Sequence, residues 1–316
     1  MSTVVISLLT LCFVNYFGHL LDPKYTEGAM DAIKAFHLLE DDSLDVIIYG
    51  SSHAWKGCDS LEMNKKYGLK AYNYGCNWQA INTTLLFLQD SLRTQSPDVV
   101  CVETGLVGKV LEDVELEGQI YYTRPIDFFQ GKKEYLSQCF GSNFGRYLTY
   151  YIPLAMFHDN WNKIEAENFK KSHPEKWIKT MGYSGTDIVN SVNLTDFASF
   201  THKDLPRSSV LVLDRMVADC KEKGVKILFY TCPFEGEYKY HSAMEEYSER
   251  TGCEYLDLFE HIDEVGIDGE TDFRDKDHLN NSGSRKVADY LGRYIVENYD
   301  IGKKLYVNET ENRTKQ

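Results

Sequence analysis

Five short apolar runs, rich in β-branched residues and each bounded by turn residues, constrain the fold of this chain more than any other feature. They are Leu44–Tyr49, Leu69–Tyr74, Asp98–Glu103, Val225–Thr231 and Glu254–Leu258. Near-continuous apolar runs of this length are typical of parallel strands that are buried on both faces. Segments with helical spacing separate the runs, and such an alternation favours right-handed crossovers and a doubly wound sheet.

The predicted helices complete this pattern. They cover Ala29–Leu39, Ala80–Arg93, Ser208–Lys223 and Ser282–Asn298. Gly224 directly follows the third helix and is a typical C-terminal stop. In the last helix, Val287, Leu291 and Ile295 recur at helical spacing. We therefore predict an α/β fold of the flavodoxin-like type, with three αβα layers and about five parallel strands.

The α/β domain is predicted to span residues 44–300. Residues 107–205 separate the third and fourth strands without a clear strand of their own and are rich in aromatic residues. We interpret them as a mostly helical insertion that lies over the strand ends. A linker with a short helix occupies 25–43, and the polar residues 301–316 form a tail.

The N-terminal segment 1–24 is the one targeting signal. Residues 4–21 carry no charge apart from His19, but the solidly apolar part, Val4 to Val14, is only 11 residues long, whereas a bilayer span needs about 20. Neither a basic segment nor a small-residue cleavage site flanks it. We favour a signal-anchor with a trimmed or misplaced start, followed by a stalk, DPKYTEG, which would place the protein on the extracytoplasmic face of the cell membrane. The alternative is a buried helix in a cytoplasmic protein.

Charge and cysteine content exclude several function classes. The formal net charge is −14 and no dense Lys/Arg run occurs, which argues against nucleic acid as a partner because phosphate binding needs a basic face. None of the eight cysteines has CxxC spacing, so a zinc ribbon or a redox motif is unsupported. Their even number leaves disulfides open.

Polar residues follow the predicted strands at the points where the strands end. These groups are Gly50-Ser51-Ser52-His53, Gly75-Cys76-Asn77-Trp78, Thr104-Gly105, Cys232-Pro233-Phe234 and, after a loop beyond the fifth strand, Asp275-Lys276-Asp277-His278. In an open parallel sheet, ligands bind at the carboxyl ends of the strands. The convergence of these groups on one edge is stronger evidence for a site than any single motif.

The chemistry that fits this edge is acyl transfer through a serine. A serine hydroxyl becomes a good nucleophile when a histidine, oriented by a carboxylate, removes its proton. Asp275 stands three residues before His278, a spacing that lets the carboxylate reach Nδ1 while Nε2 faces Ser52. His53 suits this task less, because neighbouring side chains point apart. The N–H of Ser52 and groups near Asn77 and Trp78 would form the oxyanion hole.

Simpler interpretations exist for these residues. Ser51 and Ser52 could cap a helix, and Asp275 could cap the last helix, although His278 then has no explanation. A metal site is disfavoured because no calcium-loop pattern is present. No Gly-x-Ser-x-Gly elbow surrounds Ser52, which excludes an α/β-hydrolase. His158 and Glu103 are further pocket candidates, with a helix-surface or core position as the alternative for His158.

Three groups of these residues resemble the SGNH/GDSL hydrolase superfamily. They are Gly50-Ser51-Ser52, Asn73-Tyr74-Gly75 and Asp275-x-x-His278. The resemblance covers about residues 44–298 without the insertion and looks most like the membrane-anchored bacterial Gly-Ser-Ser-His subset, to which the D-alanyl-lipoteichoic-acid transfer protein is a distant cousin. It implies that Ser52 is the nucleophile, His278 the base and Asp275 its orienting carboxylate. Gly75, Asn77, Trp78 and Gly105 match the regions that serve the oxyanion or the substrate.

This sequence departs from the family pattern at three places. Ser51 replaces the usual aspartate, and Trp78 stands roughly where a glycine is usual. The third block, Glu103-Thr104-Gly105, lacks the family's asparagine, so the oxyanion hole must use backbone groups or Asn77.

The expected function is that of a serine esterase or O-acyltransferase. It would act on acyl esters, above all acetyl esters, of a cell-surface glycan or polymer without a cofactor or metal. The resemblance implies that some members work beside a membrane-bound acyltransferase. The alternative from another class is a non-catalytic module that binds a glycan or a partner on the same fold.

Overall fold

The computed structural model of the protein describes residues 2–21, 28–169 and 172–301. The predicted stalk, apart from Gly28, and the predicted tail, apart from residue 301, lie outside the described residues.

The centre of the fold is a parallel sheet of five strands in the order β2-β1-β3-β4-β5. The strands are β1 (Val46–Tyr49), β2 (Ala71–Asn73), β3 (Val99–Glu103), β4 (Lys226–Thr231) and β5 (Glu254–Asp257). In this register Ile48 pairs with Cys101, and Cys101 pairs with Leu228. The order is that of flavodoxin-like folds, so the predicted fold class is confirmed.

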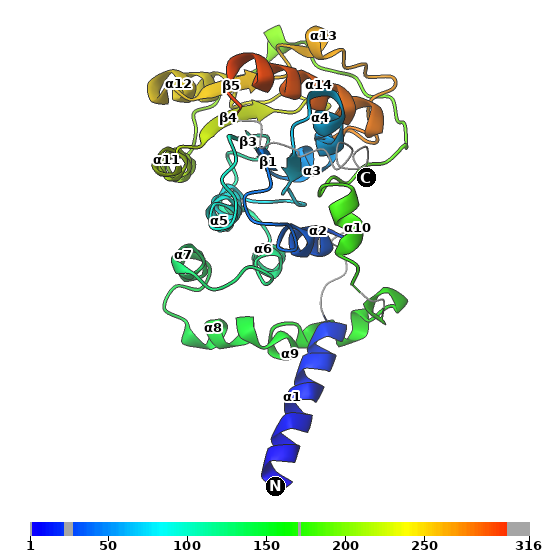
Figure 1. Ribbon diagram of the computed structural model, residues 1–316, viewed down its shortest axis with the longest axis vertical. Helices are drawn as coiled ribbons and strands as arrows, with labels where there is room; N and C mark the ends of the chain where they lie inside the picture. The colour runs from blue at the N-terminus through cyan, green and yellow to red at the C-terminus, as the bar shows by residue number, and fades with distance from the viewer. Residues whose placement is uncertain (1, 22–27, 170–171, 302–316) are drawn as a thin grey trace, which may run out of the picture.

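Alternate strand residues face two separate cores, because side chains along a strand point to opposite faces. Residues such as Ile47 and Val100 pack beneath α2 (Ala29–Phe36), α5 (Ile81–Ser91), α11 (Arg207–Lys223) and α12 (His241–Thr251). Residues such as Ile48 and Cys101 pack on the other face, which is covered by α4 (Ser60–Tyr67), α13 (Ile262–Val265) and α14 (Asn281–Asn298). Figure 1 shows the sheet between these two sets of helices.

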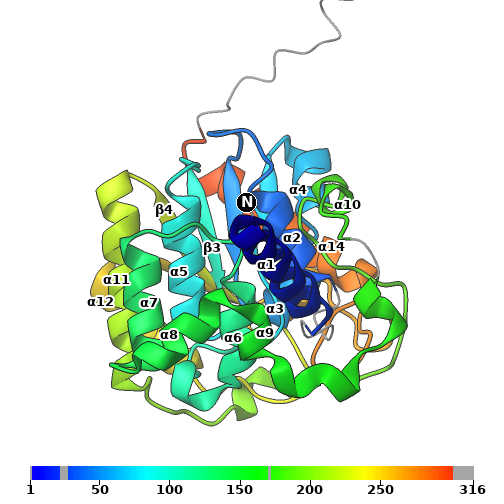
Figure 2. The ribbon, with the colours of Figure 1, turned by 90° about the horizontal axis from the view of Figure 1, so that it is seen from below.

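The insertion at 107–205 contains no strand among its described residues. Its elements are η1 (Leu111–Asp113), α6 (Leu116–Tyr122), α7 (Gln130–Phe140), α8 (Phe144–Tyr151), α9 (Pro153–Met156), η2 (His158–Lys163), η3 (Ala166–Phe169), α10 (Glu175–Lys179) and η4 (Phe197–Ser199). The regular structure of these described residues is helical, but α7, α8 and α9 do not lie over the strand ends, where the sequence analysis placed the insertion. These helices form an additional layer outside α5 (Figures 1 and 2), where the aromatic side chains of α7 and α8 pack together.

The last third of the insertion wraps round the β2 edge of the sheet. The Asn73 N–H donates to the Met181 carbonyl at 2.9 Å. Further along, the N–H of Asn190 donates to the Phe273 carbonyl at 2.8 Å, on the face that carries α14. The segment therefore joins the two faces of the domain.

The N-terminal helix α1 (Ser2–Leu20) projects from the body of the protein beside α9 (Figure 1). Its final carbonyls are bound by the insertion: Asn168 Nδ2 donates to Leu20 O at 2.8 Å, and Asn160 Nδ2 donates to Leu21 O at 3.2 Å. Apolar side chains along its length, such as Leu11, are exposed, so the buried-helix alternative is wrong for this structure. Across the described residues, no helix combines the length and the apolar character that crossing a membrane requires.

Candidate active site

The turn after β1 places Ser52 at the carboxyl edge of the sheet. Gly50 has a φ of 143°, and a Cβ there would lie 2.8 Å from the Glu103 Cβ and 3.0 Å from the Ala54 Cβ, so only glycine fits. The next residue, Ser51, is the N-cap of the short helix α3 (Ser52–Gly57), and its hydroxyl accepts from the His53 N–H at 3.3 Å. Ser51 therefore carries the capping role, which leaves the Ser52 side chain to other partners.

Ser52, His278 and Asp275 form a continuous hydrogen-bonded chain. His278 Nε2 lies 2.8 Å from Ser52 Oγ, and His278 Nδ1 lies 2.7 Å from Asp275 Oδ1. Asp275 also accepts from the Asp277 N–H at 3.0 Å, and Arg274 Nε lies 3.2 Å from its other oxygen. The structure thus brings together the three residues that the sequence analysis singled out, with the serine–histidine–carboxylate connections that nucleophilic catalysis requires.

The loop that carries Asp275 and His278 is fixed at both ends. Phe273 and Leu279 form an isolated antiparallel bridge. Asn280 caps α14 by accepting from the N–H groups of Ser282 and Gly283, while its Nδ2 donates to the Thr271 carbonyl at 2.8 Å. This closed loop explains how a histidine three residues after an aspartate can turn back onto it.

The local electrostatics favour a neutral histidine beside an ionised aspartate. Burial lowers the pKa of His278 below its ordinary value, and the charge of Asp275 only partly offsets this. Burial by itself raises the pKa of Asp275, but the adjacent His278 and the Asp277 N–H outweigh it and hold that pKa below its usual range. At neutral pH the imidazole is therefore able to accept a proton from Ser52.

Asn73, at the end of β2, ties the serine turn to the neighbouring loop. Its side chain is fully buried, with Nδ2 donating to the carbonyls of Ala54 at 2.7 Å and Cys58 at 2.9 Å. Its Oδ1 accepts from the Gly75 N–H at 3.1 Å. Gly75 was predicted to serve the oxyanion or the substrate; in this structure its N–H donates to Asn73 Oδ1, and a Cβ there would lie 3.1 Å from the Trp55 nitrogen of α3.

A second polar chain lies beneath the serine turn. Glu103 ends β3 and is buried, and its carboxyl accepts from the Gly105 N–H at 2.8 Å and lies 3.5 Å from the Ser51 hydroxyl. That hydroxyl is 3.3 Å from His53 Nδ1. A Cβ on Gly105 would lie 2.7 Å from both Glu103 Oε1 and His53 Nδ1. Gly105 therefore makes room for this chain, and it is not among the residues that line the pocket described below.

Burial controls the protonation of both ends of this second chain. It raises the pKa of Glu103 to about 8, against which the N–H groups of Gly105 and Cys232 act only partly. Burial, with a smaller contribution from the nearby His278, lowers the pKa of His53 to about 4. The His53 ring stacks on Phe234, with ring centroids 5.2 Å apart. Both groups are therefore neutral at pH 7, and His53 is placed beside His278 without replacing it as the base.

These residues open into a pocket of about 770 Å³, a size that suits a small-molecule ligand. Of the predicted site residues, Ser52, His53, Asn77, Trp78, Asp275 and His278 line it. Glu103 lies beneath it. His158 is elsewhere, exposed in η2, with Nδ1 2.9 Å from the Ala155 carbonyl, so the helix-surface alternative for His158 was the correct one.

Several pocket residues were not anticipated from the sequence. Lys56 stands one helical turn after Ser52 in α3, lines the same pocket and contributes to lowering the pKa of His278. Its i,i+4 spacing from the serine was a usable signal. Arg274, Lys109 and Gln119 also line the pocket, but the insertion residues Lys109 and Gln119 carried no motif that would place them there.

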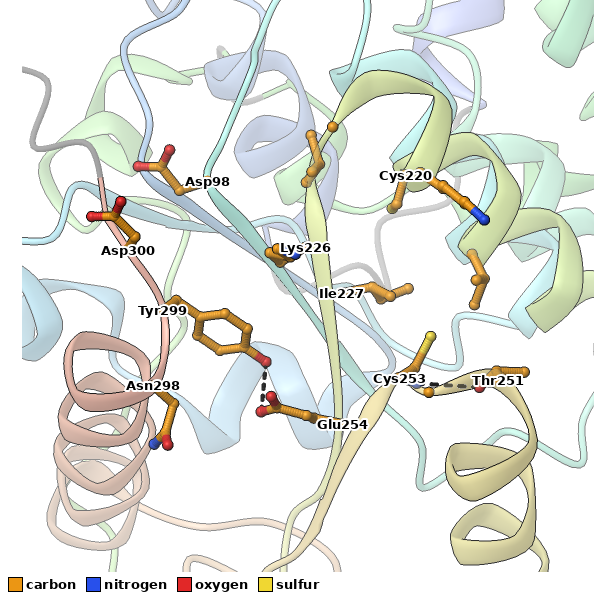
Figure 3. A pocket seen from close by; sticks show the side chains of 15 residues that line it. Asp98, Cys220, Lys226, Ile227, Thr251, Cys253, Glu254, Asn298, Tyr299 and Asp300 are labelled. Carbon is orange, nitrogen blue, oxygen red and sulfur yellow. Dashed lines mark hydrogen bonds between the residues drawn. The ribbon is translucent and has the colours of Figure 1, made fainter.

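Metal-ligand clusters, cysteine pairs and a second cavity are the other places where a site could lie. No cluster of three or more His, Cys, Asp or Glu side chains that could hold a metal occurs among the described residues, and all eight cysteines are free thiols. A second cavity, of about 610 Å³, lies at the opposite ends of β3, β4 and β5 (Figure 3). There the Glu254 carboxylate already accepts hydrogen bonds from Tyr299 at 2.8 Å and Tyr294 at 2.7 Å. The pocket beside Ser52 therefore remains the candidate active site.

Comparisons with known proteins add little to this geometry. No protein-family model matches the chain, and no curated protein matches it. A solved structure from Bacteroides fragilis, described as a candidate acylhydrolase, aligns with 84% of this chain and 94% of its own at 12% identity and a TM-score of 0.41. A likeness at this level does not establish a shared activity.

Proposed function

We propose that this protein is a serine esterase or O-acyltransferase of the SGNH/GDSL type that works through an acyl-enzyme. The observation that carries the proposal is the Ser52–His278–Asp275 chain at the carboxyl edge of the sheet, opening into a pocket. The proposed reaction uses side chains and backbone groups of the protein itself, without a cofactor or a metal.

The reaction takes place in two steps. Ser52 Oγ attacks the ester carbonyl carbon while its proton passes to His278 Nε2, and Asp275 stabilises the imidazolium. The C–O bond to the leaving alcohol then breaks, and the alkoxide takes the proton from His278. In the second step, water or a sugar hydroxyl gives a proton to His278 and attacks the acyl carbon, and Ser52 leaves with that proton.

The negative charge on the carbonyl oxygen needs donors other than the family's asparagine. Ser52 is the first residue of α3, and the first N–H groups of a helix have no partner within the helix. Asn77 lines the same pocket and supplies an amide. We assign these two groups to the oxyanion hole.

The proposed substrates are acyl esters, above all acetyl esters, of a cell-surface glycan or polymer. The pocket supports this class because polar side chains such as Asn77 and Lys109 stand beside apolar ones such as Leu106 in its wall, and a sugar ring offers both hydroxyls and apolar C–H faces. A membrane-bound acyltransferase is the proposed partner for acyl supply.

We further propose that the protein acts at the extracytoplasmic membrane surface. The helix α1 exposes apolar side chains on all sides, including Val4, Leu8 and Leu11, and helices of this kind are stable where an apolar environment surrounds them. α8 exposes Phe144 and Leu148 in the layer that holds the base of α1. Flotation of the protein with liposomes should be lost in a Leu8→Glu, Leu11→Glu variant, and unchanged flotation would contradict the proposal.

The second candidate function is a non-catalytic glycan-binding module. The missing asparagine and the engaged Gly75 N–H favour it, since both reduce the donors available to an oxyanion. This candidate predicts saccharide binding by a protein whose Ser52 is unreactive.

Acetate release from O-acetylated saccharides tests the proposed activity. Wild type should release acetate, and Ser52→Ala should lower the rate by a factor on the order of 10⁴ or more. Lys276→Ala is a matched control in the same loop, because the exposed Lys276 side chain pairs with Glu235 at 3.0 Å and does not line the pocket. Saccharide binding without any acetate release would instead support the second candidate.

A further inference from the structure

Trp78 is an exposed aromatic side chain at the rim of the candidate active site. It is 70% exposed and lines the same pocket as Ser52 and His278. Trp161 is equally exposed, at 71%, but it lies away from the pocket, whereas Trp78 exposes its ring beside Ser52 and His278. The position of Trp78 therefore needs an explanation beyond folding.

The backbone at Trp78 is strained. Its φ is 55°, which places a bulky residue in the left-handed region that favours glycine. Strain of this kind persists only where the surroundings enforce it, and it gathers at functional sites. A folding role would favour glycine here, so the strained tryptophan points to a role in binding.

A buried glutamine enforces this conformation. Gln119 of α6 donates from Nε2 to the Trp78 carbonyl at 2.7 Å, while its Oε1 accepts from the Ala80 N–H at 3.0 Å and the Thr83 hydroxyl at 2.6 Å. Gln119 is almost completely buried. These three bonds fix the backbone of the segment that carries Trp78, so the attachment point of its side chain is set before a ligand arrives.

The pocket around Trp78 has both apolar side chains, among them Leu106, and polar ones. Asn77, Lys109, Asp113 and Glu115 line the same pocket. Glu115 is exposed and its side chain does not cap α6. A saccharide ring fits this mixed wall, because it presents an apolar face for stacking on Trp78 and hydroxyls for the amide and the carboxylates.

We propose that Trp78 is the stacking platform of a saccharide subsite, with Asn77, Asp113 and Glu115 binding the ring hydroxyls. The subsite holds the pyranose ring that carries or accepts the acyl group, next to Ser52. This inference rests on the proposed function and adds to it a substrate class, an acylated pyranose, and the residue that selects it.

Competition between substrates tests the subsite. The kcat/KM for O-acetylated methyl glucoside, galactoside and N-acetylglucosaminide is divided by the kcat/KM for triacetin, which is an ester without a ring. Trp78→Ala should lower the best of these ratios about fivefold to tenfold through KM, from the usual worth of an aromatic contact. Trp161→Ala is the matched control, since Trp161 is 71% exposed but lies in η2, away from the pocket, and it should leave the ratio unchanged. An unchanged ratio in Trp78→Ala, or no turnover of any pyranoside by a protein that hydrolyses triacetin, overturns the proposal.

Two further measurements are needed. The first distinguishes a binding role of Trp78 from a structural role, and the second distinguishes failure of the subsite from failure of the proposed activity. Trp78→Gly should unfold at a higher urea concentration than Trp78→Ala, because glycine accepts the positive φ. The reverse order overturns the idea of a strained platform.

If wild type proves inert towards fluorophosphonates and esters, the proposed function fails. The subsite is then tested alone by quenching of intrinsic fluorescence with the same pyranosides. Quenching that is lost in Trp78→Phe but kept in Trp161→Phe upholds the subsite, and its persistence in Trp78→Phe overturns it.

Discussion

Replacing Asn73 by alanine tests how far the turn that carries Ser52 depends on a buried side chain that takes no part in the reaction. The side chain is fully buried and does not line the pocket, yet it makes three hydrogen bonds, to the carbonyls of Ala54 and Cys58 and from the Gly75 N–H. Asn73→Ala removes all three hydrogen bonds and leaves a cavity where the amide was. The variant tests whether hydrogen bonds from Asn73, at the end of β2, stabilise the last turn of α3.

The expected cost follows from these contacts. A buried hydrogen bond contributes about 0.5–1.5 kcal/mol net. Ala54 O keeps a second donor, the Cys58 N–H at 3.2 Å, so Cys58 O and the Gly75 N–H carry the penalty of unpaired groups. We therefore expect the free energy of unfolding to fall by about 3 kcal/mol. Asn73→Asp should cost at least as much, since it loses both Nδ2 donors and buries a charge.

Urea unfolding followed by circular dichroism measures this change. Asn77→Ala is the control: it lies four residues further along, lines the pocket and is only half-buried, so its stability should change by less than about 0.5 kcal/mol. The same preparations can be assayed well below their unfolding midpoints, where Asn73→Ala should also acylate Ser52 more slowly than wild type. A loss of stability below about 0.5 kcal/mol in Asn73→Ala would refute the reasoning.

Three further predictions concern the two polar chains. Asp275→Asn should slow acylation by about 10³–10⁴ while stability changes little, measured by burst kinetics; a loss below tenfold would exclude Asp275 as the orienting carboxylate. The acylation rate should rise with pH through the lowered pKa of His278 and be near its plateau at pH 7, so a midpoint above pH 7 would count against His278 as the base. Glu103 has its pKa raised from 4.5 to about 8 by burial, so the stability it contributes is complete below pH 4.5 and is lost as pH rises to 8. In Glu103→Gln the urea midpoint should fall less over that range, and identical curves for variant and wild type would contradict the assignment.

The fold was predictable because the apolar runs, bounded by turn residues, indicate directly where the strands of the sheet lie. Each of the five predicted runs contains one of the five strands, with the ends trimmed by one or more residues at most positions. The short helices α3 and α4, between β1 and β2, and the helix α12 were not predicted. They are at most 11 residues long, and short polar helices take their stability from tertiary packing, which the sequence pattern does not record. The boundaries of the domain at 44 and 300 stay a prediction.

The site was predictable where its residues lie close to a strand end in sequence. Ser52 follows β1 directly, and the Asp-x-x-His spacing identified Asp275 and His278. The pocket wall that comes from the insertion was not predictable, because Lys109 and Gln119 depend on how 107–122 folds back over the strand ends. Gly75 and Gly105 were assigned to the substrate, but each has a nearby partner that only the three-dimensional arrangement reveals: the Asn73 side chain for Gly75 and the Glu103 carboxyl for Gly105.

The most direct test of the central claim is the intact mass of the protein after treatment with a fluorophosphonate, for wild type and Ser52→Ala. The geometry around Ser52 predicts one adduct per wild-type chain, mapped to Ser52 by peptide analysis, and no adduct on Ser52→Ala. A folded wild-type protein that gains no adduct, or an adduct that persists in Ser52→Ala, would contradict the account of Ser52 as an activated nucleophile.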